Sequence, residues 1–336
     1  MAVIAGVLTM GALALSLALL TSAPAHRRTV AATPGAATAA SSVPRRATRS
    51  SGRRPLSPPT ALRPGPGPAV SGGTAWQPYG RLVDGVAAIY ELHGATGTPV
   101  SATPFAIAWM DTRLLRATLY SGSEIPGGGP YRHSAPISPG AARVLVAAFN
   151  AGFLMDNSNG GYYTDGRVVA PLRAGAASVV IYRNGGVTVA NWGRDARMTA
   201  AVASVRQNLD LLVDHGRPVP GLDPNDTSVW GYTLGNQVYV WRSGLGVTAD
   251  GALVYVAGAR LNITELADLL VRAGAVRAME LDINTDAVSF ATYRPPSPTA
   301  LASPSNGTDL VAGMVGTPAR YFEPWWARDF FTMSAR

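Results

Sequence analysis

The sequence of 336 residues contains neither cysteine nor lysine. Without cysteine the chain has no disulfide bond, no cysteine-ligated zinc or iron–sulfur cluster and no thiol nucleophile. Without lysine, all 28 basic residues are arginines, and a lysine acting as Schiff base or general base is excluded. Charged residues are also scarce, at 14% of the chain against about 25% in average proteins. The chain is nevertheless long enough to bury a core without disulfides.

Several common catalytic motifs are missing as well. The sequence has no Walker A loop, no G-x-S-x-G motif and no H-E-x-x-H motif. The four histidines do not have the spacing of metal ligands, so we predict that they are linker, surface or turn residues and that they hold no metal: His26, His93, His133 and His215.

The net charge of +8 comes from one end of the chain. Eight of the 28 arginines and none of the 20 acidic residues precede Trp76, which leaves 20 arginines and 20 acidic residues after it. A neutral domain does not predict a nucleic-acid partner, and nothing in the sequence indicates a protein partner.

The N-terminal residues 1–25 are predicted to be a membrane anchor or signal segment. Ala2–Leu20 is almost continuously apolar, and 19 residues rising about 1.5 Å each span roughly the 30 Å core of a bilayer. Ala23–Ala25 resembles a signal-peptidase site. We therefore expect a single-pass membrane protein with an extracytoplasmic domain, or a secreted one if cleaved near Ala25. The arginines that follow favour the opposite orientation by the positive-inside rule, unless the true start lies upstream or the distant domain is exported regardless.

Residues 26–75 are rich in Ala, Pro, Ser, Thr and Arg and contain few large apolar side chains. Such a segment cannot bury enough surface to offset its ordering entropy, so it is predicted to be a disordered linker. Residues 76–336 then form the predicted domain.

Within that domain, strand-like runs alternate with glycine-containing turns at Val86–Leu92, Pro104–Met110, Arg116–Tyr120 and Val144–Phe149. Two hairpins are predicted around Arg183–Gly186 and Ala249–Gly251. Asn262 and Glu265 form a capping-box pattern before Leu266, Leu269 and Leu270, which predicts a helix ending at Gly274, and Val276–Ile283 follows as a strand. Ala200–Val213 is predicted to be a second helix. The fold class is α+β, a single domain with mixed, largely antiparallel sheets and a few packing helices.

Glu280 and Asp282 are the first candidate catalytic pair. Two residues apart on a strand, they point to the same face, while Met279 and Leu281 point into a helix-packed core. Neighbouring carboxylates raise each other's pKa, which suits acid–base chemistry. The alternative is an acidic strand that faces solvent or pairs with arginine.

Asp282, Asn284 and Asp286 have the D-x-N-x-D spacing that begins an EF-hand loop. The rest of that loop does not match, because Ala287 replaces the turn glycine and Tyr293 stands at the closing glutamate position. We predict no cofactor, with a calcium site of another kind as the alternative.

Three further groups could bind a sugar or a phosphate. Phe149–Phe153 contains Asn150 and Gly152 and leads into the polar loop Asp156–Tyr163, where Tyr162 and Tyr163 could stack on a sugar ring. Arg242 is followed by small residues, which suits either a bidentate phosphate contact or a structural ion pair.

In this order the segments resemble the phosphodiester glycosidase family. The resemblance rests on Asn150–Phe153, Arg242–Gly246, Ile263–Ala267 and Leu281–Asp282, and it covers about Val144–Phe290. Where the family has a glycine-rich run after its aspartate, this sequence has Ile283–Asp286.

The resemblance implies hydrolysis of a sugar-1-phosphodiester at its glycosidic bond, in a sugar phosphate or a polysaccharide. It implies that Arg242 holds the phosphate, and that Asp282, with Glu280, activates water or stabilises the transition state. The residues expected to position the substrate are Asn150, Gly152, Asp156, Tyr162, Tyr163, Asn284 and Asp286. The alternative, favoured by the altered run 283–286, is a non-catalytic carbohydrate-binding surface protein with the same fold.

Overall fold

The computed structural model describes residues 54–72, 75–97, 102–316 and 318–336. The apolar segment Ala2–Leu20 and most of the expected linker lie outside these ranges. Within them, no helix has the length and hydrophobicity that crossing a membrane requires.

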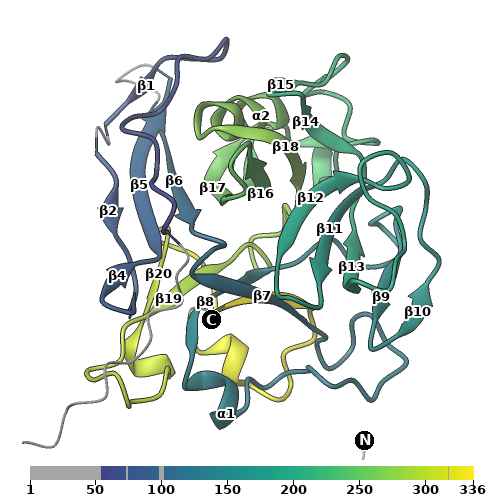
Figure 1. Cartoon of the computed structure of the whole chain (residues 1–336). Helices are drawn as coiled ribbons and strands as arrows, with labels where there is room; N and C mark the ends of the chain where they lie inside the picture. The colour runs from purple at the N-terminus through teal and green to yellow at the C-terminus, as the bar shows by residue number, and fades with distance from the viewer. Residues whose placement is uncertain (1–53, 73–74, 98–101, 317) are drawn as a thin grey trace, which may run out of the picture. The chain divides into compact units, whose positions relative to one another are not determined.

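The described chain consists mainly of antiparallel β-sheets (Figure 1). The large sheet has nine strands, in the order β1 (Val70–Ser71), β5 (Ile89–Thr96), β6 (Thr103–Met110), β17 (Leu253–Leu261), β16 (Val240–Thr248), β18 (Ala275–Glu280), β14 (Leu211–Asp214) and β15 (Arg217–Pro218), with β2 (Gln77–Pro78) also paired to β5. A short ribbon joins β3 (Leu82–Val83) to β4 (Val86–Ala87).

Two five-stranded sheets pack against the large one. The second sheet has the order β10 (Arg167–Ala170), β9 (Tyr162–Thr164), β13 (Val202–Gln207), β11 (Ala177–Tyr182) and β12 (Val187–Asn191). The third sheet has the order β20 (Gly307–Asp309), β19 (Phe290–Tyr293), β8 (Leu145–Asn150), β21 (Phe330–Ala335) and β7 (Leu115–Tyr120).

Helices are few in the described residues. They are α1 (Pro139–Ala142), α2 (Ile263–Arg272) and three short 3-10 turns at Leu234–Asn236, Pro304–Asn306 and Arg320–Phe322. The prediction of largely antiparallel sheets with a few helices is therefore confirmed in its coarse form, as a β-rich fold.

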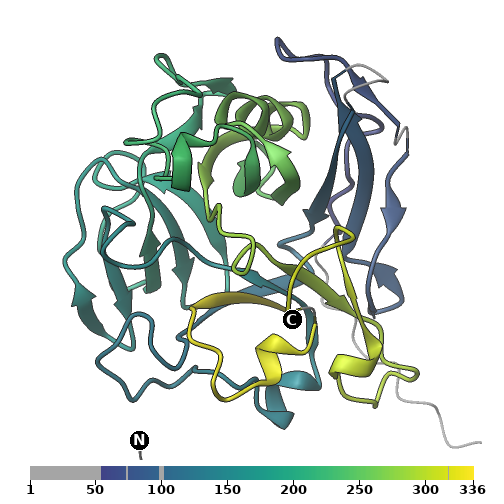
Figure 2. The same ribbon diagram turned by 180° about the vertical axis from the view of Figure 1, so that it is seen from behind.

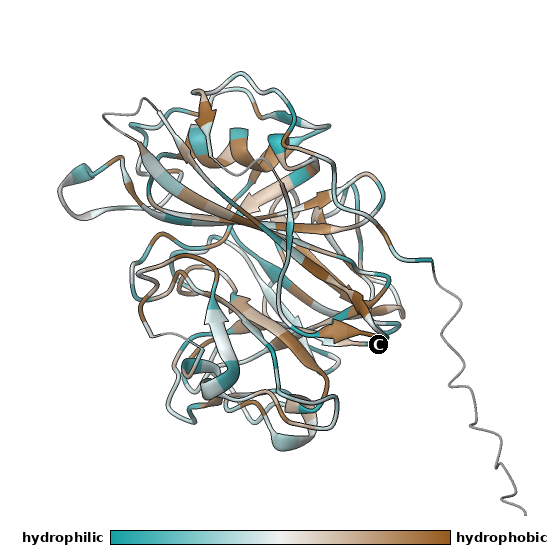
Figure 3. Ribbon diagram, turned by 90° about the vertical axis from the view of Figure 1, so that its left-hand side faces the viewer, coloured by the Kyte–Doolittle hydropathy of each residue, from teal (hydrophilic) through white to brown (hydrophobic). Residues whose placement is uncertain are grey.

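The large sheet has a hydrophobic cluster on each face, because its side chains alternate between the two faces. On β17, Val254 and Val256 pack with α2, whereas Leu253 and Tyr255 pack with the inner faces of the other two sheets. Figure 3 shows the hydrophobic stretches running along these stacked strands, and Figure 2 shows α2 from the opposite side.

Helix α2 follows the predicted capping box. Asn262 Oδ1 accepts the Glu265 backbone N–H at 2.8 Å, and Glu265 Oε2 accepts the Asn262 N–H at 3.0 Å. Gly274, with φ of +98°, ends the helix in the left-handed conformation that glycine adopts readily. A Cβ at Gly244 on β16 would lie 2.9 Å from Leu270 Cδ1, so this glycine lets the helix pack closely on the sheet.

The predicted helix Ala200–Val213 is wrong. The segment forms β13 and β14, separated at Leu209 by a left-handed residue with φ of +53°. Each strand is completed by a distant partner, β13 by β9 and β11, and β14 by β18. This pairing satisfies the backbone and buries Val202 and Val205, so tertiary context decides the structure. Both hairpins and the strands predicted at Pro104–Met110, Arg116–Tyr120 and Val144–Phe149 are confirmed. The run Val86–Leu92 is divided between β4 and β5, and the strand predicted at Val276–Ile283 ends at Glu280.

Part of the predicted linker lies on the domain. Leu56 donates its backbone N–H to Asp111 Oδ2 at 2.8 Å. Arg272 of α2 donates to the carbonyls of Gly65, Gly67 and Pro68. Thus residues 54–72 of the expected linker are bound to the large sheet and its helix, because their backbone groups find partners there.

Replacing Asn262 by alanine removes the side chain that caps α2. We expect the free energy of unfolding to fall by about 1 kcal/mol, because the Glu265 N–H loses its acceptor at the buried helix end. Chemical denaturation measures this loss, and Asn262→Ser, which retains a capping oxygen, should recover most of it. Equal stability of the alanine variant and the wild type would contradict this account of the cap.

Candidate active site

A cavity of about 460 Å³ opens beside the end of β18. Gly231 forms part of its wall with φ of +95°, and a Cβ there would come within 2.6 Å of Ile283 Cδ1. The side chains that line the cavity are both polar and apolar: Phe153, Leu154, Asn157, Leu209, Ser228, Val229, Tyr232, Asp282, Ile283, Asn284 and Arg328.

Asp282 is the carboxylate on the cavity wall. Its Oδ1 accepts the backbone N–H groups of Ile283 and Asn284, both at 2.8 Å. Its Oδ2 accepts a short hydrogen bond from Arg328 Nη2. Burial raises the pKa of Asp282, whereas the Arg328 guanidinium and the two N–H groups act to lower it. The net direction is upward, which favours a carboxylate that can take a proton.

Arg328 is a cavity residue that the sequence analysis did not identify. It precedes β21, and besides Asp282 it donates to the Gly152 carbonyl at 2.9 Å. Its side chain keeps 15% exposure, so the guanidinium reaches the cavity while remaining attached to the wall. Its short surrounding sequence matches no motif, and only folding brings it to Asp282, 46 residues away.

A buried polar network lies directly behind Asp282. Ser243 Oγ accepts the Asp282 backbone N–H at 3.2 Å, and Asn150 Nδ2 donates to the same Oγ at 3.1 Å. Asn150 Oδ1 in turn accepts Tyr255 OH at 2.8 Å and the Ser289 N–H at 3.1 Å. Asn150 was expected to position the substrate; in the structure its amide is buried behind Asp282 and fixes the backbone of the site.

The loop after β8 is held by three side chains from other elements. Asn208 Oδ1 accepts the Phe153 N–H at 3.0 Å, and Arg206 and Arg328 donate to the Phe153 and Gly152 carbonyls. A Cβ at Gly152 would lie 2.9 Å from Asn208 Oδ1 and 3.1 Å from Arg206 Cζ. Gly152 is thus the residue that allows these groups to approach the loop.

Arg206 is also half of a fully buried ion pair. Its Nε donates to Asp329 Oδ2 at 2.7 Å, and both side chains are at most 1% exposed. Because Asp329 follows Arg328, this pair fixes the position at which Arg328 meets Asp282.

Arg242 and Glu280 lie outside the cavity. They form a second buried ion pair at 2.6 Å, and Arg242 also donates to the carbonyls of Leu261 and Trp230. Its guanidinium is 1% exposed, so the structure does not place it to bind a phosphate, and Glu280 is not placed to contact substrate. Arg242 and Glu280 therefore fit the alternative given in the sequence analysis, a structural ion pair between an arginine and an acidic strand.

The face of β18 that packs against helix α2 differs from the predicted one. Met279 and Leu281 do share a face, but they pack between the sheets, and it is Ala278 that packs with α2. Glu280 ends the strand, and Asp282 lies beyond it on the cavity wall. The helix-packed core is therefore on the Glu280 side of the sheet.

The polar loop does not bring its predicted residues to this cavity. Tyr162 is fully buried, with its hydroxyl 3.1 Å from Ser121 Oγ, so it cannot stack on a sugar. Tyr163 packs against the cluster around Val180 in the second sheet. Asp156 is exposed and does not line the cavity. Because side chains alternate along β9, Tyr162 packs in the large cluster between the sheets and Tyr163 lies on the opposite face, beside the cluster around Val180.

Of the D-x-N-x-D residues, Asn284 lines the cavity and Asp286 does not. Asn284 Oδ1 accepts the Asp286 N–H at 2.8 Å, just as Asp282 Oδ1 accepts two N–H groups of its own loop. The oxygens thus fold the loop in successive Asx turns. Among the described residues, no three His, Asp or Glu side chains group as a metal site.

The comparison with protein families agrees with the motifs. Residues 143–282 match the family model of the phosphodiester glycosidases. The family match supports a glycosidase-like hydrolase. The matched range contains Asn150, Gly152 and Asp282 but ends before Arg328.

Two solved structures show weaker similarity. A hypothetical protein from Synechocystis has 15% identity and a TM-score of 0.37, covering 75% of this chain and 63% of that chain. A candidate exported protein from Burkholderia pseudomallei K96243 has 14% identity and a TM-score of 0.33, covering 69% and 74%. This chain thus spans less than two thirds of the Synechocystis protein. No curated protein matches the chain.

Replacing Gly152 by alanine tests the close approach at the loop. The new methyl group should displace Asn208 or Arg206 and lower the free energy of unfolding by about 1–3 kcal/mol. Gly140→Ala in α1 is the matched control, because a Cβ there meets only Ser138 Oγ at 3.9 Å. Equal effects of the two substitutions in chemical denaturation would show that Gly152 has no special packing role.

The protonation of Glu280 should give stability a measurable pH dependence. Burial raises the pKa of Glu280 from 4.5 to about 7, although Arg242 acts to lower it. The folded protein then holds the proton more tightly than the unfolded chain, so this contribution is present below the unfolded pKa and is lost as the pH rises through the folded one.

Glu280→Gln removes the titration. The free energy of unfolding of the wild type, minus that of the variant, should therefore fall from about pH 5 to about pH 8. Urea titrations across this range measure the difference. If this difference in the free energy of unfolding stayed constant or rose with pH, the pKa of Glu280 would not be raised in the folded protein.

Proposed function

We propose that the protein is an extracytoplasmic hydrolase that cleaves a sugar-1-phosphodiester in the cavity beside Asp282. One observation carries the proposal: Asp282, the aspartate of the family-like motif, meets Arg328 on the wall of an open cavity. A carboxylate and a guanidinium side by side suit a substrate with a reacting sugar carbon and an anionic leaving group.

Arg328, rather than Arg242, is the residue that holds the phosphate in this proposal. Its guanidinium is anchored through Nη2 to Asp282 and Gly152, and it retains exposure toward the cavity. An anchored guanidinium loses little freedom when a phosphate oxygen binds, which favours binding and orientation. Asn157, Ser228 and Asn284 supply polar groups for the sugar, and Phe153 and Tyr232 supply apolar surface.

Asp282 acts on the water or on the charge that develops at the sugar. Water adds to C1 of the sugar, and the bond between C1 and the phosphate oxygen breaks. A proton of the water passes to Asp282. The products are the free sugar and a phosphate monoester, whose oxygen is a weak base and needs little acid assistance. In this mechanism Asp282 is the one carboxylate that takes part in the reaction, and Glu280 is a structural residue.

The N-terminal sequence supports the proposed location and partners of the protein. The apolar segment Ala2–Leu20 supports export, with the domain either anchored in the membrane or released near Ala25. The substrate would then be a phosphodiester-linked sugar in an envelope or extracellular polysaccharide.

A non-catalytic carbohydrate-binding role is the second candidate. It is favoured by Ile283, whose side chain borders the cavity where the family has glycine, and by the 2% exposure of the Asp282 side chain. Both features restrict how closely a substrate approaches the carboxylate. Binding of a neutral glycan without any turnover is the outcome that distinguishes this role.

Asp282→Asn tests the hydrolase directly. With the α-anomers of glucose and N-acetylglucosamine carrying a 1-(methyl phosphate), release of reducing sugar should fall about 100-fold or more, because the amide cannot take a proton. Asp286→Asn is the matched control: it makes the same change in the same loop, outside the cavity, and should retain activity. Melting curves confirm that both variants are folded.

Two results would contradict the proposal. If the Asp282→Asn variant hydrolysed the substrates at the wild-type rate, Asp282 would not be the catalytic carboxylate. A wild type that binds these sugars but never releases reducing sugar would support the carbohydrate-binding role.

A further inference from the structure

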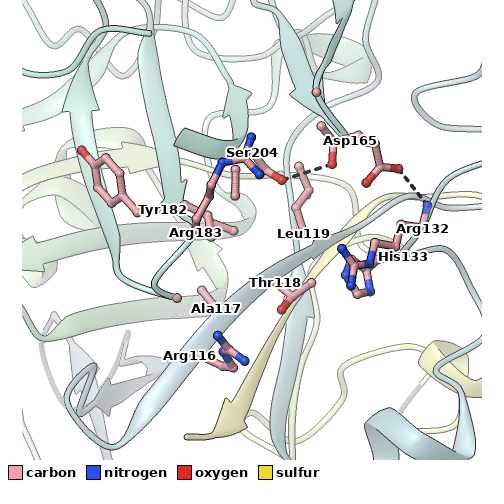
Figure 4. A pocket seen from close by; sticks show the side chains of 15 residues that line it. Arg116, Ala117, Thr118, Leu119, Arg132, His133, Asp165, Tyr182, Arg183 and Ser204 are labelled. Atoms are coloured by element: carbon pink, nitrogen blue, oxygen red, sulfur yellow. Dashed lines mark hydrogen bonds between the residues drawn. The ribbon is translucent and has the colours of Figure 1, made fainter. Parts of the chain in front are cut away.

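A second cavity, of about 800 Å³, lies between β7 of the third sheet and the second sheet (Figure 4). It shares no lining residue with the cavity beside Asp282. Arg116 and Thr118 come from β7, Arg183 from the hairpin after β11, and Arg132 and His133 from the segment between β7 and α1. Two of its arginines, Arg116 and Arg132, also lie outside residues 143–282, the range that matches the family.

The cavity carries an excess of positive charge. Among the described residues that line it, three are arginines and Asp165 is the only acid. Asp165 Oδ2 is already engaged by the backbone N–H of Arg132 at 2.8 Å. Burial lowers the pKa of His133, and the neighbouring charge of Arg132 lowers it further. The site therefore attracts anions through its guanidinium groups.

Two of these guanidinium groups have no partner within the part of the chain that the structure describes. Within the described residues, neither the Arg116 nor the Arg132 guanidinium has a hydrogen bond or ion pair, whereas Arg206, Arg242 and Arg328 are all paired with carboxylates. The Arg116 side chain lies over Gly185, where a Cβ would come within 2.8 Å of Arg116 Cβ. Its position is thus defined although its charge is unpaired.

Hydroxyl groups line the space between the arginines. Thr118 borders the cavity, and Thr164 Oγ1 lies 3.1 Å from Ser204 Oγ on its wall, whereas the Tyr182 side chain packs against the cluster around Val180. The arginines approach from different elements, as Figure 4 shows, so their charges are spread around the cavity. Separated cations and hydroxyls suit a hydroxylated ligand with more than one negative group.

We infer that this cavity is a second binding site, for an anionic oligosaccharide whose phosphate or carboxylate groups are held by Arg116, Arg132 and Arg183. The negative charge of the ligand follows from the cavity itself, whereas its carbohydrate nature rests on the proposed function. Bound there, an anionic glycan would be held on the protein independently of the hydrolytic site. Single-stranded nucleic acid has a similar charge but is bound on aromatic stacking platforms, whereas the described lining residues include only two aromatic ones, Tyr182 and His133.

The experiment measures binding to the protein by calorimetry at fixed ionic strength. The probes are maltopentaose phosphorylated at its 6-hydroxyls, penta-galacturonate, neutral maltopentaose and pentathymidylate. We expect at least one anionic sugar to bind at least tenfold more tightly than maltopentaose, and the comparison of phosphate with carboxylate identifies the preferred group. Since no probe contains a sugar-1-phosphodiester, the result is independent of the hydrolysis assay.

The double variant Arg116→Gln/Arg132→Gln should weaken this binding at least tenfold while the melting temperature stays unchanged, because neither guanidinium group has a hydrogen-bond or ion-pair partner among the described residues. Arg197→Gln/Arg260→Gln is the matched control, with the same loss of charge at exposed positions that do not line the cavity. Binding that is unaffected by the first variant, or weakened equally by the control, would overturn the site. Tighter binding of pentathymidylate than of either anionic sugar would overturn the ligand class.

Discussion

The buried ion pair between Arg206 and Asp329 is the constraint on which the candidate active site depends. It joins the end of β13 to the start of β21, which are 123 residues apart. The pair also fixes Phe153, through the carbonyl that Arg206 binds, and sets the position of Arg328. A buried charge without its partner would be strongly unfavourable, so the three segments are held in one arrangement.

A chain with few charged residues places many of them at this end of the large sheet. Arg242 with Glu280 and Arg206 with Asp329 are closed to solvent, whereas Arg328 with Asp282 borders a cavity. The first two pairs define backbone positions, and the third has a face that a ligand can reach. Exposure, rather than residue type, separates the structural pairs from the candidate catalytic one.

The basic cavity between the second and third sheets has the opposite arrangement. Its arginines come from strands and connections that pack around it, yet Arg116 and Arg132 have no acidic partner in the described parts of the chain. In a domain where arginines and acidic residues are balanced overall, such local imbalance requires the acids to be used elsewhere. The ion pairs behind Asp282 are among the contacts that use them.

Local sequence determined the elements whose stabilising contacts are close along the chain. The capping box at Asn262, the turn at Arg183–Gly186 and the motif aspartate Asp282 could all be recognised from neighbouring residues. The helix expected at Ala200–Val213 could not be corrected from sequence, since β13 and β14 are completed by strands from distant segments. Arg242 and Arg328 have the same side chain, and only tertiary structure decided which one reaches a cavity, because burial and long-range pairing are properties of the folded chain.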